Sequence, residues 1–124
     1  MRILLIEPNR SPRPSSIDDT LKAMQHIVGG PIQAIYPFDE PVALVCNEEA
    51  KLTGLPPNRA LRDKDGNLYD IICGTFFLCA APPDNEHFES LTDEQIARYT
   101  QLYRKPELFL RMGEELFAVP MEAD

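Results

Sequence analysis

Short apolar runs separated by polar or proline-rich breaks dominate the chain, a pattern that predicts several short β-strands. The runs lie at residues 2–7, 32–36, 42–46 and 68–80. The first is apolar at consecutive positions, which is typical of a central, buried strand. Pro37–Pro41 forms a turn between the second and third runs, so we expect a hairpin there. Asp65-Gly66 is a hairpin-turn signal ahead of the longest run, where Gly74 indicates a bulge or a close approach.

Apolar residues recur at helical spacing in three other segments, residues 17–28, 93–104 and 107–117. Ser16 is placed to cap the first of these helices, and Gly29-Gly30 ends it. Thr92 and Gln95 have the spacing of a capping box at the start of the second. The third would be a short helix near the end of the chain.

These elements predict an α+β fold, with a small, mainly antiparallel sheet and two or three helices packed on it. Three prolines make residues 8–15 a solvated loop, and a proline pair precedes an irregular or short helical segment at 58–62. A chain of 124 residues fits one domain. We therefore expect a single domain at 1–105 and a C-terminal extension at 106–124, which would hold the third helix.

Acidic residues outnumber basic ones, and the excess is concentrated late in the chain. The formal net charge is −8 at pH 7. Residues 1–83 hold 10 acidic and 8 basic side chains, whereas residues 84–124 hold 10 acidic and 4 basic ones. Because phosphate backbones repel such a surface, direct nucleic-acid binding is not expected. The segment 84–124 would suit a basic protein partner; the alternative is that its acidity only confers solubility.

The cysteines and the lengths of the apolar segments indicate in which cellular compartment the protein is expected. Cys46, Cys73 and Cys79 are odd in number, lie in strand-like runs and lack Cys-x-x-Cys spacing. We expect them to be buried, free thiols in a reducing cytoplasm. No apolar run approaches the length of a signal peptide or a membrane span, so we expect a cytoplasmic protein without membrane contact.

No motif in the chain defines a reaction or a metal site. His26 and His87 lie far apart in sequence and the cysteines resemble core residues, so neither a zinc site nor a Cys/His pair is expected. No cofactor is predicted. Gly29-Gly30 follows a helix rather than preceding one, which is the wrong side for a phosphate cradle.

The polar insert around Arg59 is where a ligand is most expected. Arginine offers a planar fork of donors to a carboxylate or phosphate, and this one follows a rigid proline pair. Asn47 and Glu48 lie across the chain reversal, and Tyr36 could supply an aromatic wall. The alternative is structural, with Arg59 tied to Asp70, to Glu48 or to a helix C-terminus. The candidate ligand-binding residues are Tyr36, Asn47, Glu48, Asn58, Arg59 and Arg62.

Several motifs resemble the domain-of-unknown-function 3846 family, over most of residues 1–104. They are IYPF at 35–38, VALVCNEE at 42–49, GLPPNRAL at 54–61, YDIICGTFF at 69–77 and LTDEQ at 91–95. Ala50 departs from the glycine of the Glu-Glu-Gly-Lys turn expected in relatives, and alanine resists the positive φ that glycine allows. The family is typical of phages, plasmids and integrative elements, so the resemblance implies an accessory protein of a mobile element. It implies no particular reaction or ligand.

Three classes of function follow. The leading hypothesis is a non-enzymatic binding protein, which engages a host protein through residues 84–124, for example in counter-defence, or sequesters an anionic small ligand at Arg59. The first alternative is a small enzyme acting on a nucleotide-like or phosphorylated substrate, with Arg59 as the anion clamp. Its base would be Glu48, Glu49 or Asp70. The second alternative is a dimeric structural or regulatory module, joined through an open sheet edge or the C-terminal helix.

Overall fold

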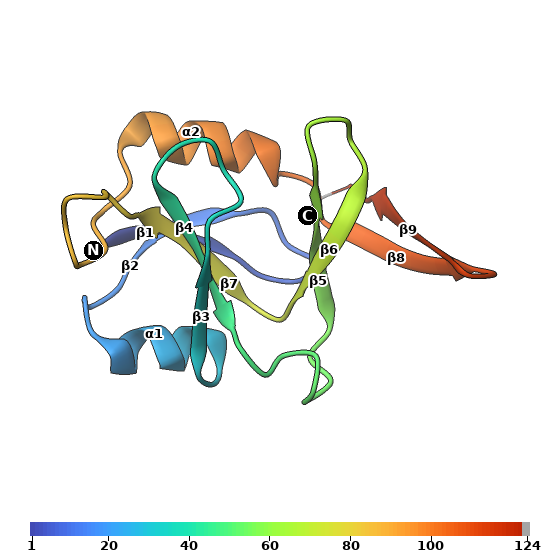
Figure 1. Ribbon diagram of the computed structural model, residues 1–124, viewed down its shortest axis with the longest axis horizontal. Helices are drawn as coiled ribbons and strands as arrows, with labels where there is room; N and C mark the ends of the chain where they lie inside the picture. The colour runs from blue at the N-terminus through green and yellow to red at the C-terminus, as the bar shows by residue number, and fades with distance from the viewer. Residues whose placement is uncertain (123–124) are drawn as a thin grey trace.

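The structure, a computed structural model, describes residues 1–122 of the chain. The end of the expected 106–124 extension, residues 123–124, lies outside the described part. Mainly antiparallel strands and two helices make up these residues, in keeping with the expected α+β class (Figure 1). In chain order the elements are β1 (Arg2–Ile6), β2 (Arg13–Ser16), α1 (Leu21–Val28), β3 (Ile32–Ile35), β4 (Val42–Asn47), β5 (Pro57–Arg62), β6 (Leu68–Cys73), β7 (Phe76–Ala80), α2 (Asp93–Leu102), β8 (Glu107–Met112) and β9 (Glu115–Pro120).

Five strands form one antiparallel sheet, in the order β2-β1-β7-β4-β3. The predicted hairpin of the second and third apolar runs is present as β3–β4, with Ile35 opposite Leu44. β1 is buried beyond its first residue and lies between β2 and β7, which confirms the expected central strand. Strands β5–β6 and β8–β9 form two separate two-stranded sheets.

Each face of the five-stranded sheet is covered by a different layer (Figure 1). On one face, α1 buries Met24 and Val28 against the sheet. On the other face, α2 buries Ile96 and Tyr99, and the β5–β6 sheet adds Leu61 to the same cluster. Burial of each large apolar side chain contributes about 1.5–3 kcal/mol, so these two layers supply much of the stability of the fold.

Helix α1 begins later than the sequence spacing predicts. The hydroxyl oxygen of Thr20 accepts a hydrogen bond from the backbone N–H of Ala23 at 3.1 Å, so Thr20 rather than Ser16 is the N-cap. Ser16 instead ends β2, an edge strand paired with β1. The predicted loop at 8–15 was therefore wrong in its second half, because an edge strand tolerates proline. The helix stops at Gly29, as predicted.

Helix α2 begins with the predicted capping box. Thr92 accepts a hydrogen bond from the backbone N–H of Gln95 at 3.1 Å, and the Gln95 side chain accepts one from the N–H of Thr92 at 2.9 Å. The helix ends at Leu102, with Tyr103 as its C-cap. Neither helix of the described chain has the length and apolar character needed to cross a membrane.

Residues 68–80 form two strands where one was predicted. Gly74 separates β6 from β7 with φ +77, and a Cβ there would lie 2.8 Å from Cδ1 of Leu55. The predicted close approach at this glycine is therefore confirmed. β7 joins the five-stranded sheet, whereas β6 turns back through the predicted hairpin to pair with β5. The segment 58–62, expected to be irregular or helical, belongs to strand β5 because it completes this pairing.

The segment predicted as a third helix is a β-hairpin. Strands β8 and β9 pair directly, with Leu108 opposite Val119. Gly113, with φ +66, opens the two-residue turn between them, a position that favours glycine. Figure 1 shows the hairpin, in orange and red, projecting away from the five-stranded sheet. The prediction of a helix at 107–117 was wrong because the same residues also alternate with the period of two that a strand requires.

Candidate functional site

A hollow of about 580 Å³ lies where the β5–β6 sheet, the C-terminal end of α2 and the base of the β8–β9 hairpin meet. Arg59 lines it from β5. The remaining polar and aromatic lining consists mainly of Phe38, Arg62, Tyr69, Tyr103, Arg104, Lys105 and Glu107. We call this hollow the basic groove.

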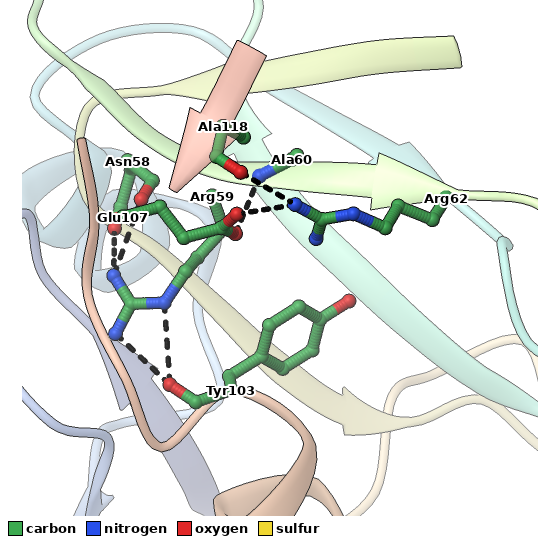
Figure 2. A network of polar contacts seen from close by, with 7 residues as sticks. All are labelled: Asn58, Arg59, Ala60, Arg62, Tyr103, Glu107 and Ala118. Carbon is green, nitrogen blue, oxygen red and sulfur yellow. Dashed lines mark hydrogen bonds and ion pairs between the residues drawn. The ribbon is translucent and has the colours of Figure 1, made fainter. Parts of the chain in front are cut away.

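Arg59 is completely buried beside the basic groove, and its guanidinium group donates to oxygens of the protein itself. Nε and Nη2 donate to the carbonyl of Tyr103, at 3.2 and 3.0 Å, and Nη2 also donates to the carbonyl of Arg10 at 2.6 Å. Nη1 donates to the side-chain and backbone oxygens of Asn58, at 2.8 and 3.2 Å. Figure 2 shows the contacts with Asn58 and Tyr103. A group with five N–H donors thus makes five hydrogen bonds.

These contacts tie Arg59 to segments far away in the sequence. Tyr103 is the C-cap of α2, so Arg59 makes the link to a helix C-terminus that the structural alternative described. Burial lowers the pKa of Arg59, and the charge of the nearby Glu107 carboxylate offsets part of that effect. Direct contact of Arg59 with a ligand stays a prediction.

Asn58, which is 1% exposed, holds the guanidinium group in place from the same strand. Its Nδ2 donates to the carbonyl of Ile6 at 2.9 Å and to that of Gly74 at 2.8 Å. Ile6 ends β1, and Gly74 follows β6. Asn58 and Arg59 together therefore join β5 to the five-stranded sheet and to α2.

Glu107 fastens the C-terminal hairpin to β5 (Figure 2). Its carboxylate accepts hydrogen bonds from the backbone N–H of Ala60 at 3.0 Å and from Nη2 of Arg62 at 2.7 Å. The side chain of Glu107 is 8% exposed, whereas that of Arg62 is 37% exposed. The carboxylate is therefore occupied by the protein, while part of the Arg62 guanidinium stays open to the groove.

The groove is cationic although the chain is acidic. Arg62, Arg104 and Lys105 are exposed, and they line it together with the buried Arg59. Among the described residues that line the groove, Glu107 alone is acidic. Charges of one sign that line a concave surface focus the potential there, so the groove is suited to attract an anion.

Aromatic rings form the apolar side of the groove. The rings of Phe38 and Tyr103 meet edge-on with centroids 6.4 Å apart, and Tyr103 meets Phe76 in the same way at 5.9 Å. Tyr69 is 57% exposed and offers a ring that faces solvent. An exposed ring beside cations suits a flat ligand that carries negative charge.

Two buried tyrosines and the buried thiol of Cys79 have strongly raised pKa values. Burial raises the pKa of Tyr103 and that of Tyr99, and for Tyr99 a hydrogen bond of 2.5 Å to Glu40 adds to the effect. Burial also raises the pKa of Cys79 to about 12. Each of these groups stays neutral in the folded protein at a pH where it ionises in the unfolded chain.

We expect the free energy of unfolding to fall as the pH rises through the alkaline range. The thiol and phenol groups ionise in the unfolded chain from about pH 9.0 and 10.0, and later in the folded state, so their stabilisation is complete below pH 9 and declines above it. Each group contributes up to about 1.4 kcal/mol per pH unit. In urea unfolding at a series of pH values, Tyr103→Phe should flatten the decline. An unchanged slope in Tyr103→Phe would contradict this account.

The six predicted ligand-binding residues lie in three places. Arg59 and Arg62 line the basic groove, with Asn58 directly beside Arg59. Tyr36 is 62% exposed and does not line the groove; Phe38, two residues later, lines it instead. The remaining two predicted residues lie at the end of β4, on another part of the surface.

Asn47 and Glu48 line a smaller hollow of about 140 Å³. The Asn47 side chain donates to the carbonyl of Val28 at 3.1 Å and accepts from the N–H of Glu49 at 2.8 Å. Asn47 therefore stabilises the end of α1 and the turn after β4. Ala50 in this turn does not have a positive φ, so the alanine fits there without strain.

The carboxylates considered as a catalytic base lie away from the basic groove. Glu48 and Asp70 line the smaller hollow, where Asp70 pairs with Lys51 at 2.7 Å. Glu49 is exposed in the turn after β4. None of the three lines the groove that Arg59 lines. Residues 1–122 also contain no group of three or more side chains that could hold a metal ion.

The three cysteines are free thiols, as predicted. Cys46 and Cys79 are buried, and Cys73 is partly buried. Burial raises the pKa of all three thiols, which keeps them protonated and weakly reactive at neutral pH.

The acidic segment 84–124 does not form one surface. Its loop and the first turn of α2 lie near the N-terminus in Figure 1, and they expose Asp84, Glu86, Glu89, Asp93 and Glu94. Glu114 and Glu115 lie at the tip of the hairpin, at the other end of the molecule. Arg104 and Lys105 lie between them. Binding of a host protein through this segment stays a prediction, with two separate acidic surfaces to consider.

Sequence reasoning missed the residues that complete the groove, namely Tyr69, Arg104, Lys105 and Glu107. Arg62 and its partner Glu107 are 45 positions apart, so no local spacing could reveal their ion pair. One local signal was present. Arg104 is the last residue of the predicted helix 93–104 and Lys105 follows it, and cations interact favourably with the C-terminal end of a helix.

A family model described as Domain of unknown function (DUF3846) matches residues 1–104. The match ends just after α2, so it includes Arg59 and Arg62 but not the β8–β9 hairpin. No curated protein and no solved structure matches the chain. Because the matched residues cover well over half of the sequence, this chain belongs to the family described as Domain of unknown function (DUF3846).

Proposed function

We propose that this chain is a non-enzymatic binding protein that holds a small anionic ligand in the basic groove. One observation carries the proposal: in a chain of net charge −8, the groove gathers four cationic residues and one carboxylate. The family resemblance supports a role as an accessory protein of a mobile element, and in that role the protein would sequester its ligand.

The exposed cations would make the direct contacts with the anion. Arg62 offers the free part of its guanidinium group, and Arg104 and Lys105 reach in from the end of α2. The C-terminus of a helix carries partial negative charge, which would repel an anion. Arg59 counters this charge by binding the terminal carbonyl of Tyr103, so its burial supports the site without direct contact.

The groove supports binding better than catalysis. Its carboxylate, Glu107, is bound by Arg62 and by the backbone of Ala60, so it is not free to accept a proton from a substrate. The three carboxylates considered as a base lie outside the groove. An anion bound there would therefore be held by cations and an aromatic ring, and the described residues that line the groove offer it no free carboxylate as a base.

Removal of the exposed charge at the end of α2 should weaken anion binding. We expect Arg104→Gln combined with Lys105→Gln to lower the affinity for phosphate, pyrophosphate or adenosine monophosphate about tenfold or more, since charge-assisted contacts contribute about 1.5–3 kcal/mol each. Isothermal titration calorimetry at fixed ionic strength measures the effect. Higher salt should weaken binding to the unmodified protein.

The matched control removes two positive charges elsewhere on the surface. Lys22 and Lys64 are exposed and do not line the basic groove. Lys22→Gln combined with Lys64→Gln should leave the affinity close to that of the unmodified protein. The proposal would be contradicted if the two double variants lowered the affinity for the anion equally, or if the unmodified protein gave no heat of binding with any of the three anions.

A further inference from the structure

The β8–β9 hairpin presents an uncovered apolar face. Alternate residues of the two strands share this face, because Leu108 is opposite Val119 and Leu110 is opposite Phe117. Their exposure ranges from 41% for Phe117 to 67% for Met112. The face consists of Leu108, Leu110, Met112, Phe117 and Val119.

The hairpin has little support of its own. A two-stranded sheet alone is at best marginally stable in water. Its base is held through Glu107, and its opposite face is only partly buried at Phe109, Leu116 and Ala118. No other element within residues 1–122 covers the apolar face. Exposed patches of this kind on an ordered element are typical of an interface.

The charges along the hairpin indicate what covers the face. The tip carries Glu114 and Glu115 against one cation, Arg111, and is therefore acidic. The base adjoins Arg104 and Lys105, which follow α2. Two carboxylates also lie there, but both are paired: Glu107 with Arg62 at 2.7 Å and Glu122 with Lys105 at 3.8 Å, so three cations and two carboxylates leave the base with a net positive charge. Strands of six residues separate tip and base by about 20 Å. The hairpin is thus apolar along its length and oppositely charged at its two ends.

We infer that a second copy of this chain covers the apolar face, in a two-fold dimer that packs the two hairpins antiparallel. In this arrangement the acidic hairpin tip of each copy lies against the cationic foot of the other copy's hairpin. The apolar faces of the two hairpins pack against each other between these ends. Two-fold symmetry makes each of these contacts twice. A parallel arrangement would bring like charges together at both ends. The apolar contacts of the dimer do not involve the groove, because Leu110 and Phe117 do not line it; the charged contacts use Arg104 and Lys105, which do.

Light scattering coupled to size exclusion tests the dimer. We expect a mass of about twice the 14.0 kDa of one chain, with dissociation on dilution. Leu110→Glu places a charge in the centre of the apolar face and should weaken dimerisation at least tenfold, equivalent to about 1.4 kcal/mol. The control is Leu52→Glu, at a residue that is 87% exposed and far from the hairpin in sequence, which should not change the mass.

Charge exchange tests the antiparallel arrangement while the apolar face stays intact. Glu115→Lys and Lys105→Glu should each weaken the dimer, and the two together should restore it, since the tip of one copy then again meets an opposite charge on the other. Circular dichroism checks that each variant is folded. The inference would be overturned by a monomer at all concentrations or by an assembly larger than a dimer. It would also be overturned if Leu52→Glu weakened dimerisation as much as Leu110→Glu, or if the exchanged pair did not restore the dimer.

Discussion

Arg59→Met should destabilise the protein by about 3 kcal/mol or more, measured by urea unfolding. Methionine fills a similar volume but donates no hydrogen bond. The buried carbonyl of Tyr103, the buried side-chain oxygen of Asn58 and the partly buried carbonyl of Arg10 would then lose their donor. Each unsatisfied buried acceptor costs about 1–3 kcal/mol. Because two of these acceptors belong to the backbone, no substitution of Arg59 by an apolar residue removes them together with the guanidinium.

Two further variants separate geometry from charge. Arg59→Lys keeps the charge but lacks the planar fork of donors, so its stability should lie between those of the unmodified protein and Arg59→Met. Arg104→Met removes an exposed arginine and should change stability by no more than about 0.5 kcal/mol. If Arg59→Met were as stable as Arg104→Met, the hydrogen bonds of the buried guanidinium would not stabilise the fold as described.

Asn58→Leu should lower the free energy of unfolding by about 2–4 kcal/mol, because the carbonyls of Ile6 and Gly74 lose their donors and Arg59 loses an acceptor. Leucine has the same branching and the same number of side-chain heavy atoms as asparagine, so the substitution leaves no cavity and the loss reflects mainly the polar contacts. The same urea titration measures the change. Gln33→Leu, at an exposed position of β3, is the control and should have little effect.

The combination of Asn58→Leu with Arg59→Met should cost less than the sum of the single changes. The two side chains share a hydrogen bond of 2.8 Å, and residues in one network couple by about 0.5–3 kcal/mol. Strict additivity in this double-mutant cycle would show that the two residues stabilise the protein independently, contrary to the network in Figure 2.

The fold was predictable where pattern and local geometry agree. The β3–β4 hairpin and the capping box of α2 follow from residues close together in sequence. The C-terminal hairpin was missed because Leu108 and Met112 satisfy two periods. They fit a helix as positions four apart, and they fit a strand when Leu110 is counted between them. Gly113, followed by a polar residue, was the turn signal that distinguishes the two.

The candidate site was harder to predict because its contacts are non-local. The planar donor fork of Arg59 after the proline pair predicted a ligand there, with a structural tie to Asp70, to Glu48 or to a helix C-terminus as the alternative. Its actual acceptors come from Arg10 and Tyr103, 49 and 44 positions away, and only tertiary structure brings them together. Arg62 was predicted as part of the site and does line the groove, yet its neighbours Arg104 and Lys105 belong to another element.

The opposite charges at the two ends of α2 give the molecule an electric polarity that its net charge conceals. Ten residues of helix separate the acidic first turn from the cationic end by about 15 Å. Electrostatic screening in physiological salt acts over about 8 Å. A charged partner therefore responds to whichever end it approaches, and not to the overall value of −8. Diffusional encounters would be oriented before any contact forms, with anions drawn to one end and cations to the other.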